Sequence, residues 1–311
     1  MENEITVGVR VPHGLFSDTA ALRDFVAGAE EAGIDRLCVG DHVTFKGGQG
    51  FDGLVHATAL AAVSTRITIQ TAVYLLPLRH PVPVARQVAS LAEFAPGRVV
   101  FGVGVGGEDP AEYRACGVDP RSRGRRMNES LGVVRALLNG AEVTASGEFF
   151  PLEDVCIRPI PSKPVPIVVG GRSEAALRRV ALHADGWLAL WVSPERYAKA
   201  CTQIEKLAAA DGPRADGWRH GMHVWCGFDR SPEQARSALA GSMEQIYRTP
   251  FEKFERYTPY GTAEDVAGAL RGYVRAGCRS FNLIPGDAGA QETIEGARSV
   301  RKLLNGQALA G

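Results

Sequence analysis

The chain has 311 residues, of which 45% are hydrophobic and 23% charged, a composition typical of a globular protein with a large core. Its 35 basic and 35 acidic residues balance, so no excess of positive charge favours binding to nucleic acid or to an anionic membrane. No apolar run approaches the roughly 20 residues that span a bilayer, and the first residues do not read as a signal peptide. We therefore expect a cytoplasmic protein.

The cysteines are widely spaced, with no Cys-x-x-Cys pair and no histidines clustered beside them; they are Cys38, Cys116, Cys156, Cys201, Cys226 and Cys278. This spacing argues against both a zinc site and a disulfide framework. We expect no metal, and cysteines that serve as small core residues in a reducing compartment.

Short runs rich in β-branched residues alternate with helical patterns along the chain. The sequence predicts strands at 5–11, 36–39, 67–73, 99–105, 167–169, 187–190, 222–228 and 280–284. A first helix begins after a cap at Asp18 or Thr19 and stops at Gly33. Further helices are predicted at 52–63, 83–94, 123–138, 173–184, 194–210, 232–247 and 262–276, with a last helix that ends near 304.

Eight strand-then-helix units in this length predict a (β/α)₈ TIM barrel, which we expect to form one domain over residues 1–311. The strands look apolar on both faces, as strands covered by helices would be. Two insertions are predicted: an irregular segment at 147–166 after the fourth helix, and an aromatic-rich segment at 248–260 after the seventh strand.

Asp41 and His42 directly follow the second predicted strand. Active sites of such barrels lie at the carboxyl ends of the strands, so both residues fall on the catalytic face. An imidazole can accept or donate a proton near neutral pH, which makes His42 a candidate for proton transfer. The alternative is a histidine that only hydrogen-bonds the barrel rim.

Glycines crowd the end of the fourth strand, in the segment Gly-Val-Gly-Val-Gly-Gly-Glu at 102–108. They let the backbone approach a flat ring or a phosphate without obstruction by a Cβ atom. The segment matches G-x-G-x-x-G, but three strand–helix units precede it and no helix opens inside it, so a dinucleotide fingerprint is not favoured. Tight packing at the barrel mouth is the alternative.

A second glycine pair ends the fifth strand, in Gly170-Gly171-Arg172-Ser173. Glycines that lead into a serine-capped helix expose backbone N–H groups at a positive dipole end, which predicts phosphate binding. The alternative is an ordinary capped turn. A competing anion site is the arginine group at the start of the fourth helix, formed by Arg121, Arg123, Arg125 and Arg126, although a salt bridge from Arg125 to Glu129 would also explain its charge.

These segments, in this order and spacing, resemble the luciferase-like monooxygenase superfamily, which includes FMN-dependent monooxygenases and F420-dependent oxidoreductases. The resemblance is carried by the segments 30–43, 67–91, 96–107, 124–138, 163–188 and 261–283. It implies that His42 lies beside the reactive part of a flavin-type ring, and that Glu108 is a second catalytic acid. It also implies a cis peptide bond at Ala72-Val73 or at Thr71-Ala72.

The resemblance further implies a set of cofactor-binding residues, namely Asp41, Ala72, Val73, Val105, Gly106, Gly107, Gly170, Gly171, Arg172 and Ser173. A homodimer is expected, and a separate flavin or F420 reductase could act as partner. The tryptophan that sugar-phosphate dehydrogenases of the family carry after the histidine is missing, since Val43 to Lys46 stand there. A sugar phosphate is therefore in doubt as the substrate.

Three functions remain open at this point. The leading one is F420-dependent hydride transfer to or from a medium-sized organic substrate. The first alternative is an FMN-dependent monooxygenase that uses reduced FMN and O₂, and the second is a non-catalytic flavin-binding protein, against which His42 and Glu108 argue. A mostly apolar substrate is predicted from the aromatic residues of the mouth loops, which are Phe45, Phe51, Tyr74, Phe149, Phe150, Tyr257 and Tyr260.

Overall fold

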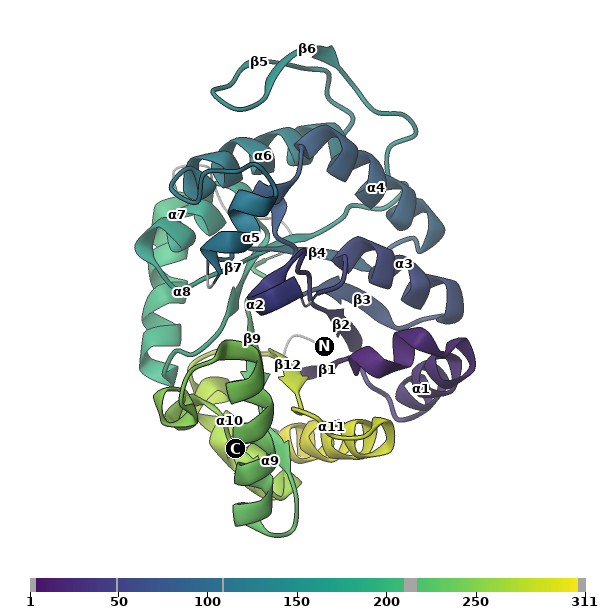
Figure 1. The fold of residues 1–311 in the computed structure, drawn as a ribbon, viewed down its shortest axis with the longest axis vertical. Helices are drawn as coiled ribbons and strands as arrows, with labels where there is room; N and C mark the ends of the chain where they lie inside the picture. The colour runs from purple at the N-terminus through teal and green to yellow at the C-terminus, as the bar shows by residue number, and fades with distance from the viewer. Residues whose placement is uncertain (1–3, 49, 108, 210–216, 307–311) are drawn as a thin grey trace.

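Eight parallel strands close into a barrel in the computed structural model, which describes residues 4–48, 50–107, 109–209 and 217–306. Around the barrel the strands follow the order β1-β12-β9-β8-β7-β4-β3-β2 (Figure 1). Their bounds are β1 Thr6–Arg10, β2 Arg36–Val39, β3 Thr68–Thr71, β4 Val99–Val103, β7 Ile167–Gly170, β8 Gly186–Ala189, β9 Gly221–Trp225 and β12 Ser280–Ile284. The predicted (β/α)₈ barrel is confirmed.

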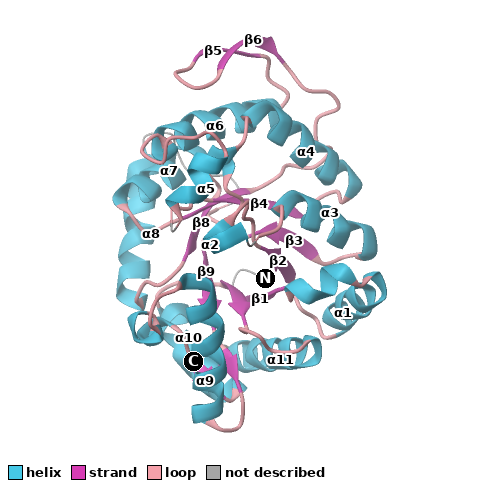
Figure 2. Cartoon of the chain, viewed as in Figure 1, coloured by secondary structure: helices cyan, strands magenta, loops and turns pink. Residues whose placement is uncertain are grey.

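Helices surround the strands on the outside (Figure 2). The helices of the barrel are α1 Thr19–Glu31, α3 Gly53–Val63, α4 Pro81–Phe94, α6 Arg123–Leu138, α7 Glu174–His183, α8 Pro194–Ala208, α9 Pro232–Tyr247, α10 Ala263–Arg275 and α11 Ala290–Gly306. Asp18 caps α1 through its side chain, and Gly33 ends it with a φ of +73°, as predicted. The predicted end of α8 at residue 210 lies outside the described residues.

The first predicted insertion is a β-hairpin, and not the irregular segment expected for 147–166. Strands β5 (Val143–Ser146) and β6 (Pro151–Val155) stand away from the barrel at the top of Figure 1. Their turn is held by Glu129, whose carboxylate accepts the N–H groups of Phe149 and Phe150. The predicted pair of Arg125 with Glu129 is therefore wrong, and Arg125 instead lies 3.0 Å from Glu148.

The second insertion follows α9 and contains short turns of 3₁₀ helix at Phe251–Lys253 and Glu255–Tyr257. The predicted seventh strand at 222–228 is divided into β9 and a separate strand, β10 (Gly227–Phe228). That strand pairs with β11 (Tyr260–Gly261), so the insertion returns to the barrel as a two-stranded sheet. Two shorter helices also lie over the barrel mouth, α2 (Phe45–Gly48) and α5 (Pro110–Ala115).

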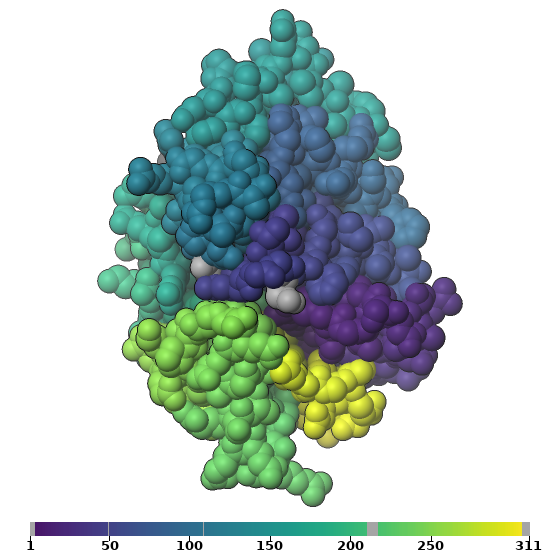
Figure 3. Space-filling view, viewed as in Figure 1, coloured from purple at the N-terminus to yellow at the C-terminus, as the bar shows by residue number. Residues whose placement is uncertain are grey.

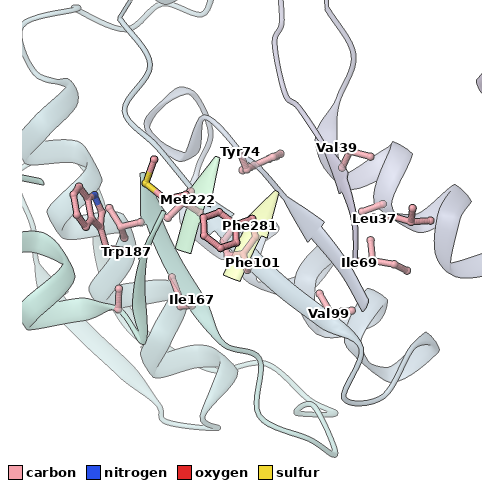
Figure 4. Close-up of a cluster of buried hydrophobic side chains, with 14 of the residues drawn as sticks. Leu37, Val39, Ile69, Tyr74, Val99, Phe101, Ile167, Trp187, Met222 and Phe281 are labelled. Carbon is pink, nitrogen blue, oxygen red and sulfur yellow. The ribbon is translucent and has the colours of Figure 1, made fainter. Parts of the chain in front are cut away.

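The two faces of the barrel strands differ in polarity. Residues that pair across neighbouring strands share a face, and Leu37, Ile69 and Val99 form one such apolar row toward the helices (Figure 4). The inward face carries polar groups: Arg36 donates to Asn282 at 2.6 Å, and Asn282 donates to Gln70 at 3.3 Å. The expectation of strands apolar on both faces is therefore wrong. These side chains tolerate burial because they hydrogen-bond one another.

Glu30, near the end of α1, fastens this helix to the start of β3. Its carboxylate accepts the N–H groups of residues 65–67 and the hydroxyl of Thr65. Partial burial alone would raise the pKa of Glu30, but these hydrogen bonds outweigh it and lower the pKa to about 2.

We expect Glu30→Gln to lower the free energy of unfolding at pH 7 by about 1–2 kcal/mol, after allowance for solvent screening of this partly exposed group. Because the folded pKa lies below the usual 4.5, this stability is present above pH 4.5 and is lost as the pH falls toward about 2. Urea melts at pH 7 and at pH 3 measure the effect. A difference between the two proteins that does not shrink at pH 3 would contradict it.

Candidate active site

A hollow opens at the carboxyl ends of the barrel strands, where the sequence places the active site. All eight barrel strands contribute to the lining of its inner part: Arg10 at β1, Gly40 to His42 after β2, Ala72 and Val73 after β3, Gly104 to Gly106 after β4, Gly170 to Arg172 at β7, Leu188, Leu190 and Trp191 at β8, His223 on β9, and Ile284 at the end of β12. Its outer part lies between α2 and the end of α9. In Figure 3 these two segments, indigo and green, meet over the middle of the molecule.

Asp41 fixes the turn that presents His42 to the hollow. The Asp41 side chain is buried and accepts hydrogen bonds from both Nη atoms of Arg79, at 2.5 and 2.9 Å. It also accepts the N–H groups of Gly53 and Leu75, at 2.9 and 2.8 Å. A single carboxylate therefore joins the turn after β2 to the start of α3 and to the segment after β3. Both of its oxygens are occupied by donors of the protein.

His42 is a third exposed and faces the hollow, with its ring held from behind. Its Nδ1 lies 3.2 Å from an oxygen of Glu112, which is buried in α5. The same carboxylate accepts the N–H of Val43 at 2.6 Å, and the ring of Phe45 stacks on the imidazole at 4.1 Å between centroids. This arrangement fixes the orientation of the ring, so that Nε2 remains for a ligand.

Glu112 is held as a carboxylate beside His42. Burial acts to raise the pKa of Glu112, but hydrogen bonds from the His42 ring and from the N–H groups of Val43 and Thr44 outweigh it and lower the pKa. This carboxylate holds the imidazole through its Nδ1 atom, 3.2 Å away. The pair can therefore take up a proton at His42 and release it again.

The ends of β3 and β4 form a wall with little side-chain cover. The peptide bond between Ala72 and Val73 is cis, at the first of the two predicted positions. A Cβ atom at Gly104 would lie 2.5 Å from Val73 Cγ2, and one at Gly170 would lie 3.1 Å from Val73 Cγ1. Close packing against Val73 thus explains why positions 104 and 170 are glycine. Because these residues have no side chain, the backbone of 104–106 and of 170–171 is exposed to the hollow.

The loop after β7 leads from this wall into α7. Ser173 caps α7 by accepting the N–H of Ala176 at 3.2 Å, as predicted, and Trp187 holds the loop by donating to the carbonyl of Gly171. Gly171 has a φ of +113°, a conformation that favours glycine, so a bulky residue there would strain the backbone whatever it did to a ligand. Arg172 reaches the hollow from the same loop.

The arginine group at the start of α6 does not line the hollow among the described residues. Arg123 donates to the carbonyl of Pro120, and Arg126 donates to that of Pro77 and stacks over Phe150. Arg123 lies against Gly107, whose φ is +117°. These contacts account for Arg123 and Arg126 as parts of the fold, and since none of the four arginines lines the hollow, the loop after β7 is favoured as the anion site.

Most of the predicted site residues meet at the hollow. Those on its wall are Asp41, His42, Ala72, Val73, Val105, Gly106, Gly170, Gly171 and Arg172. Gly107 and Ser173, which follow the lining residues Gly106 and Arg172 in the sequence, are not part of the lining, and Glu108 lies outside the described residues. In the part of the chain that is described, no group of three or more His, Cys, Asp or Glu side chains is placed to hold a metal ion.

Several residues of the site were missed from the sequence. Glu112 could have been found, because Asp109-Pro110 is a typical helix start that places Glu112 in a first turn. Of the aromatic residues predicted for the mouth, Phe45 and Phe51 line the hollow, whereas Tyr257 and Tyr260 line a separate pocket near α10. The outer part of the hollow also holds Arg10, Lys46 and Arg248, cationic side chains that were not predicted there from the sequence.

Comparison with known proteins places the chain in a family. The family described as luciferase-like monooxygenase matches residues 5–291, and the chain belongs to it. An uncharacterised protein of Mycobacterium tuberculosis is 32% identical over 222 residues, covering 63% of this chain and 76% of its own. An F420-dependent glucose-6-phosphate dehydrogenase of Kineococcus radiotolerans is 27% identical, covering 82% of this chain and 84% of its own.

Solved structures show the same fold. An F420-dependent secondary alcohol dehydrogenase, in complex with an F420–acetone adduct, has a TM-score of 0.83 at 20% identity and covers 97% of this chain and 99% of its own. The monooxygenase RslO1 of Streptomyces bottropensis has a TM-score of 0.81 at 19% identity, covering 98% of this chain and 100% of its own. Family and fold together mark the chain as an enzyme. No helix of the described residues is both long and apolar enough to cross a membrane.

Proposed function

We propose that this chain is an F420-dependent oxidoreductase that transfers a hydride to or from a carbon of a small organic substrate. The observation that carries the proposal is His42, which faces the hollow with its Nδ1 hydrogen-bonded to the buried Glu112. That arrangement supplies a group for proton transfer at the mouth of the barrel. Relatives and structural neighbours whose names state F420 dependence support the choice of cofactor.

The described wall of the hollow fits a flat cofactor with a phosphate. The bare backbone of 104–106 and the cis peptide at Ala72–Val73 would lie along the ring, and Gly170 to Arg172 with the start of α7 would hold the phosphate. When bound, F420 supplies the carbon that accepts or donates the hydride. In the oxidation, the substrate alcohol loses a hydride from carbon and its hydroxyl proton to His42, and a carbonyl forms.

An experiment on the purified protein tests the reaction. The visible absorbance of F420 is followed with a panel of secondary alcohols, and that of reduced F420 with the matching ketones, under nitrogen and in air. We expect equal rates in both atmospheres, and a rate lower by at least about 10²-fold with the His42→Ala variant. A reaction that requires oxygen and reduced FMN would contradict the proposal.

That second outcome corresponds to the alternative function, an FMN-dependent monooxygenase. It is favoured by the structural likeness to RslO1 and to a long-chain alkane monooxygenase, which has a TM-score of 0.74 at 17% identity. A homodimer, a partner reductase and a cytoplasmic location remain predictions from the sequence.

The phosphate site can be tested at Arg172. We expect Arg172→Ala to weaken F420 binding by about 1–2 kcal/mol, because a charge-assisted hydrogen bond to the phosphate is lost. Fluorescence titration of F420 measures the affinity, and Arg178→Ala, on the exposed part of α7, serves as the matched control. Unchanged affinity in a folded Arg172→Ala protein would move the phosphate away from this loop.

A further inference from the structure

We propose that the inner wall of the hollow formed by β1 and β9 binds a carboxylate on Arg10, and that the substrate is therefore an organic acid. The assignment of this carboxylate to the substrate depends on the proposed function. The carboxylate site itself depends only on the residues described below.

Arg10 is the last residue of β1, and its side chain points into the barrel. It borders both the inner and the outer part of the hollow, between the turn after β2 and His223 of β9. Gly40 leaves space beside it, because even a Cβ atom at Gly40 would lie 3.5 Å from Arg10 Nη2. The guanidinium can therefore be reached by a ligand in the hollow.

No acidic side chain of the described residues pairs with Arg10, whose Cζ atom lies 5.9 Å from the centre of the Trp225 ring. Its one hydrogen-bond partner there is the Nε2 atom of His13, which accepts from Nη2. The acidic groups near the hollow are already committed, Asp41 to Arg79 and Glu112 to His42. The guanidinium thus keeps most of its N–H donors for another acceptor.

The two histidines beside Arg10 do not add charge to this site. Burial lowers the pKa of His13 to about 4 and that of His223 to about 3, so both rings are neutral near pH 7. Burial also lowers the pKa of Arg10 from its usual value of 12.5, but a guanidinium stays protonated near pH 7 in proteins. A buried cation without an anionic partner is costly to the fold, and a bound carboxylate would offset that cost. A planar carboxylate also matches the guanidinium fork.

Other polar atoms of the hollow also have no hydrogen-bond partner among the described residues. The Nδ1 atom of His223 and the Nε1 atom of Trp191 are buried and unpaired, and both side chains line the inner part. Trp191 has a φ of +52°, a strained conformation for a bulky residue that occurs most often at functional sites. Since the indole N–H can only donate, it too requires an acceptor such as an oxygen of the ligand.

The barrel order separates this wall from the cofactor wall. The proposed cofactor residues lie on the neighbouring strands β3, β4 and β7, whereas Arg10 and His223 lie on β1 and β9, with β12 between them. Lys46 and Arg248 at the outer part add positive charge along the path to Arg10. An anionic substrate would be drawn along this path and would face the cofactor across the hollow.

Calorimetric titration of the purified protein tests the site with straight-chain carboxylates from acetate to octanoate and with the matching amides. We expect at least one carboxylate to bind ten or more times tighter than its amide, since only the carboxylate pairs with Arg10. Arg10→Met should weaken that binding at least tenfold, and Arg10→Lys should retain part of it. Arg178→Met, on the outer face of α7, is the matched control and should change nothing.

The outcomes separate this inference from the proposed function, because F420 is titrated in parallel. Equal affinity for carboxylates and amides overturns the inference, and so does an Arg10→Met protein that binds carboxylates as before. Loss of F420 affinity by the same factor as carboxylate affinity also overturns it, since Arg10 would then belong to the cofactor site. If Arg10→Met does not fold, the inference is tested by the affinities of carboxylates and amides for the wild-type protein and by carboxylate binding to Arg10→Lys. Carboxylate binding without F420 binding would refute only the proposed function.

Discussion

Replacing His42 by alanine is expected to lower turnover by about 10²- to 10⁴-fold, the usual contribution of a positioned acid or base. Affinity for F420 should stay nearly unchanged, because in the proposed site the loop after β7 and the backbone that follows β3 and β4 would hold the phosphate and the ring. Steady-state kinetics and F420 titration of the same preparation measure the two effects. An equal loss of binding and turnover would make His42 a residue that positions the cofactor.

Glu112 provides the matched comparison for His42. We expect Glu112→Gln to lower kcat by a smaller factor with little change in KM, because the amide keeps a hydrogen-bonding side chain but removes the negative charge beside Nδ1 of His42. The pH profile of kcat should change as well. A Glu112→Gln protein that is less stable but has a normal pH profile would assign Glu112 to the fold alone.

The second large effect is expected at Arg79. Arg79→Met should lower the free energy of unfolding by about 3–5 kcal/mol, because it leaves the buried carboxylate of Asp41 without its ion-pair partner. The remaining N–H donors, from Gly53 and Leu75, cannot neutralise that charge. Denaturant unfolding measured at pH 7, with the m-value checked for two-state behaviour, gives the number.

An exposed ion pair serves as the control for Arg79. Arg178 lies 2.7 Å from Glu174 on α7, with both side chains more than 60% exposed. Arg178→Met should therefore change the free energy of unfolding by less than about 1 kcal/mol. If the two variants lost similar free energies of unfolding, the buried Asp41–Arg79 pair would not stabilise the fold more than an exposed ion pair does.

The fold could be predicted from local sequence patterns because each barrel unit carries its own signal. β2, β12, α6 and α9 lie where the periodicity placed them, and the Ser173 cap follows from local helix chemistry. The hairpin of β5 and β6 was missed because its turn is held by Glu129, a residue outside the hairpin. The polar barrel interior was missed because strand composition does not tell which residues face inward.

The site was predicted only in part, for a related reason. His42 and the glycine loops stand at strand ends, which the fold class marks directly. Glu112 meets His42 across 70 residues of sequence, and Arg79 meets Asp41 across 38. Such pairs arise from tertiary structure alone. Arg10 and His223 can likewise be recognised as parts of one site only in the folded barrel, where β1 and β9 lie on either side of β12.

The central claim, F420 as the cofactor of this barrel, is tested most directly by reconstitution. The purified protein is incubated with equal amounts of F420 and FMN, freed of unbound cofactor by gel filtration, and its absorbance is recorded before and after reduction and exposure to air. We predict that the retained spectrum is that of the deazaflavin and that the reduced form persists in air. Retention of FMN instead, with rapid reoxidation by oxygen, would contradict the account.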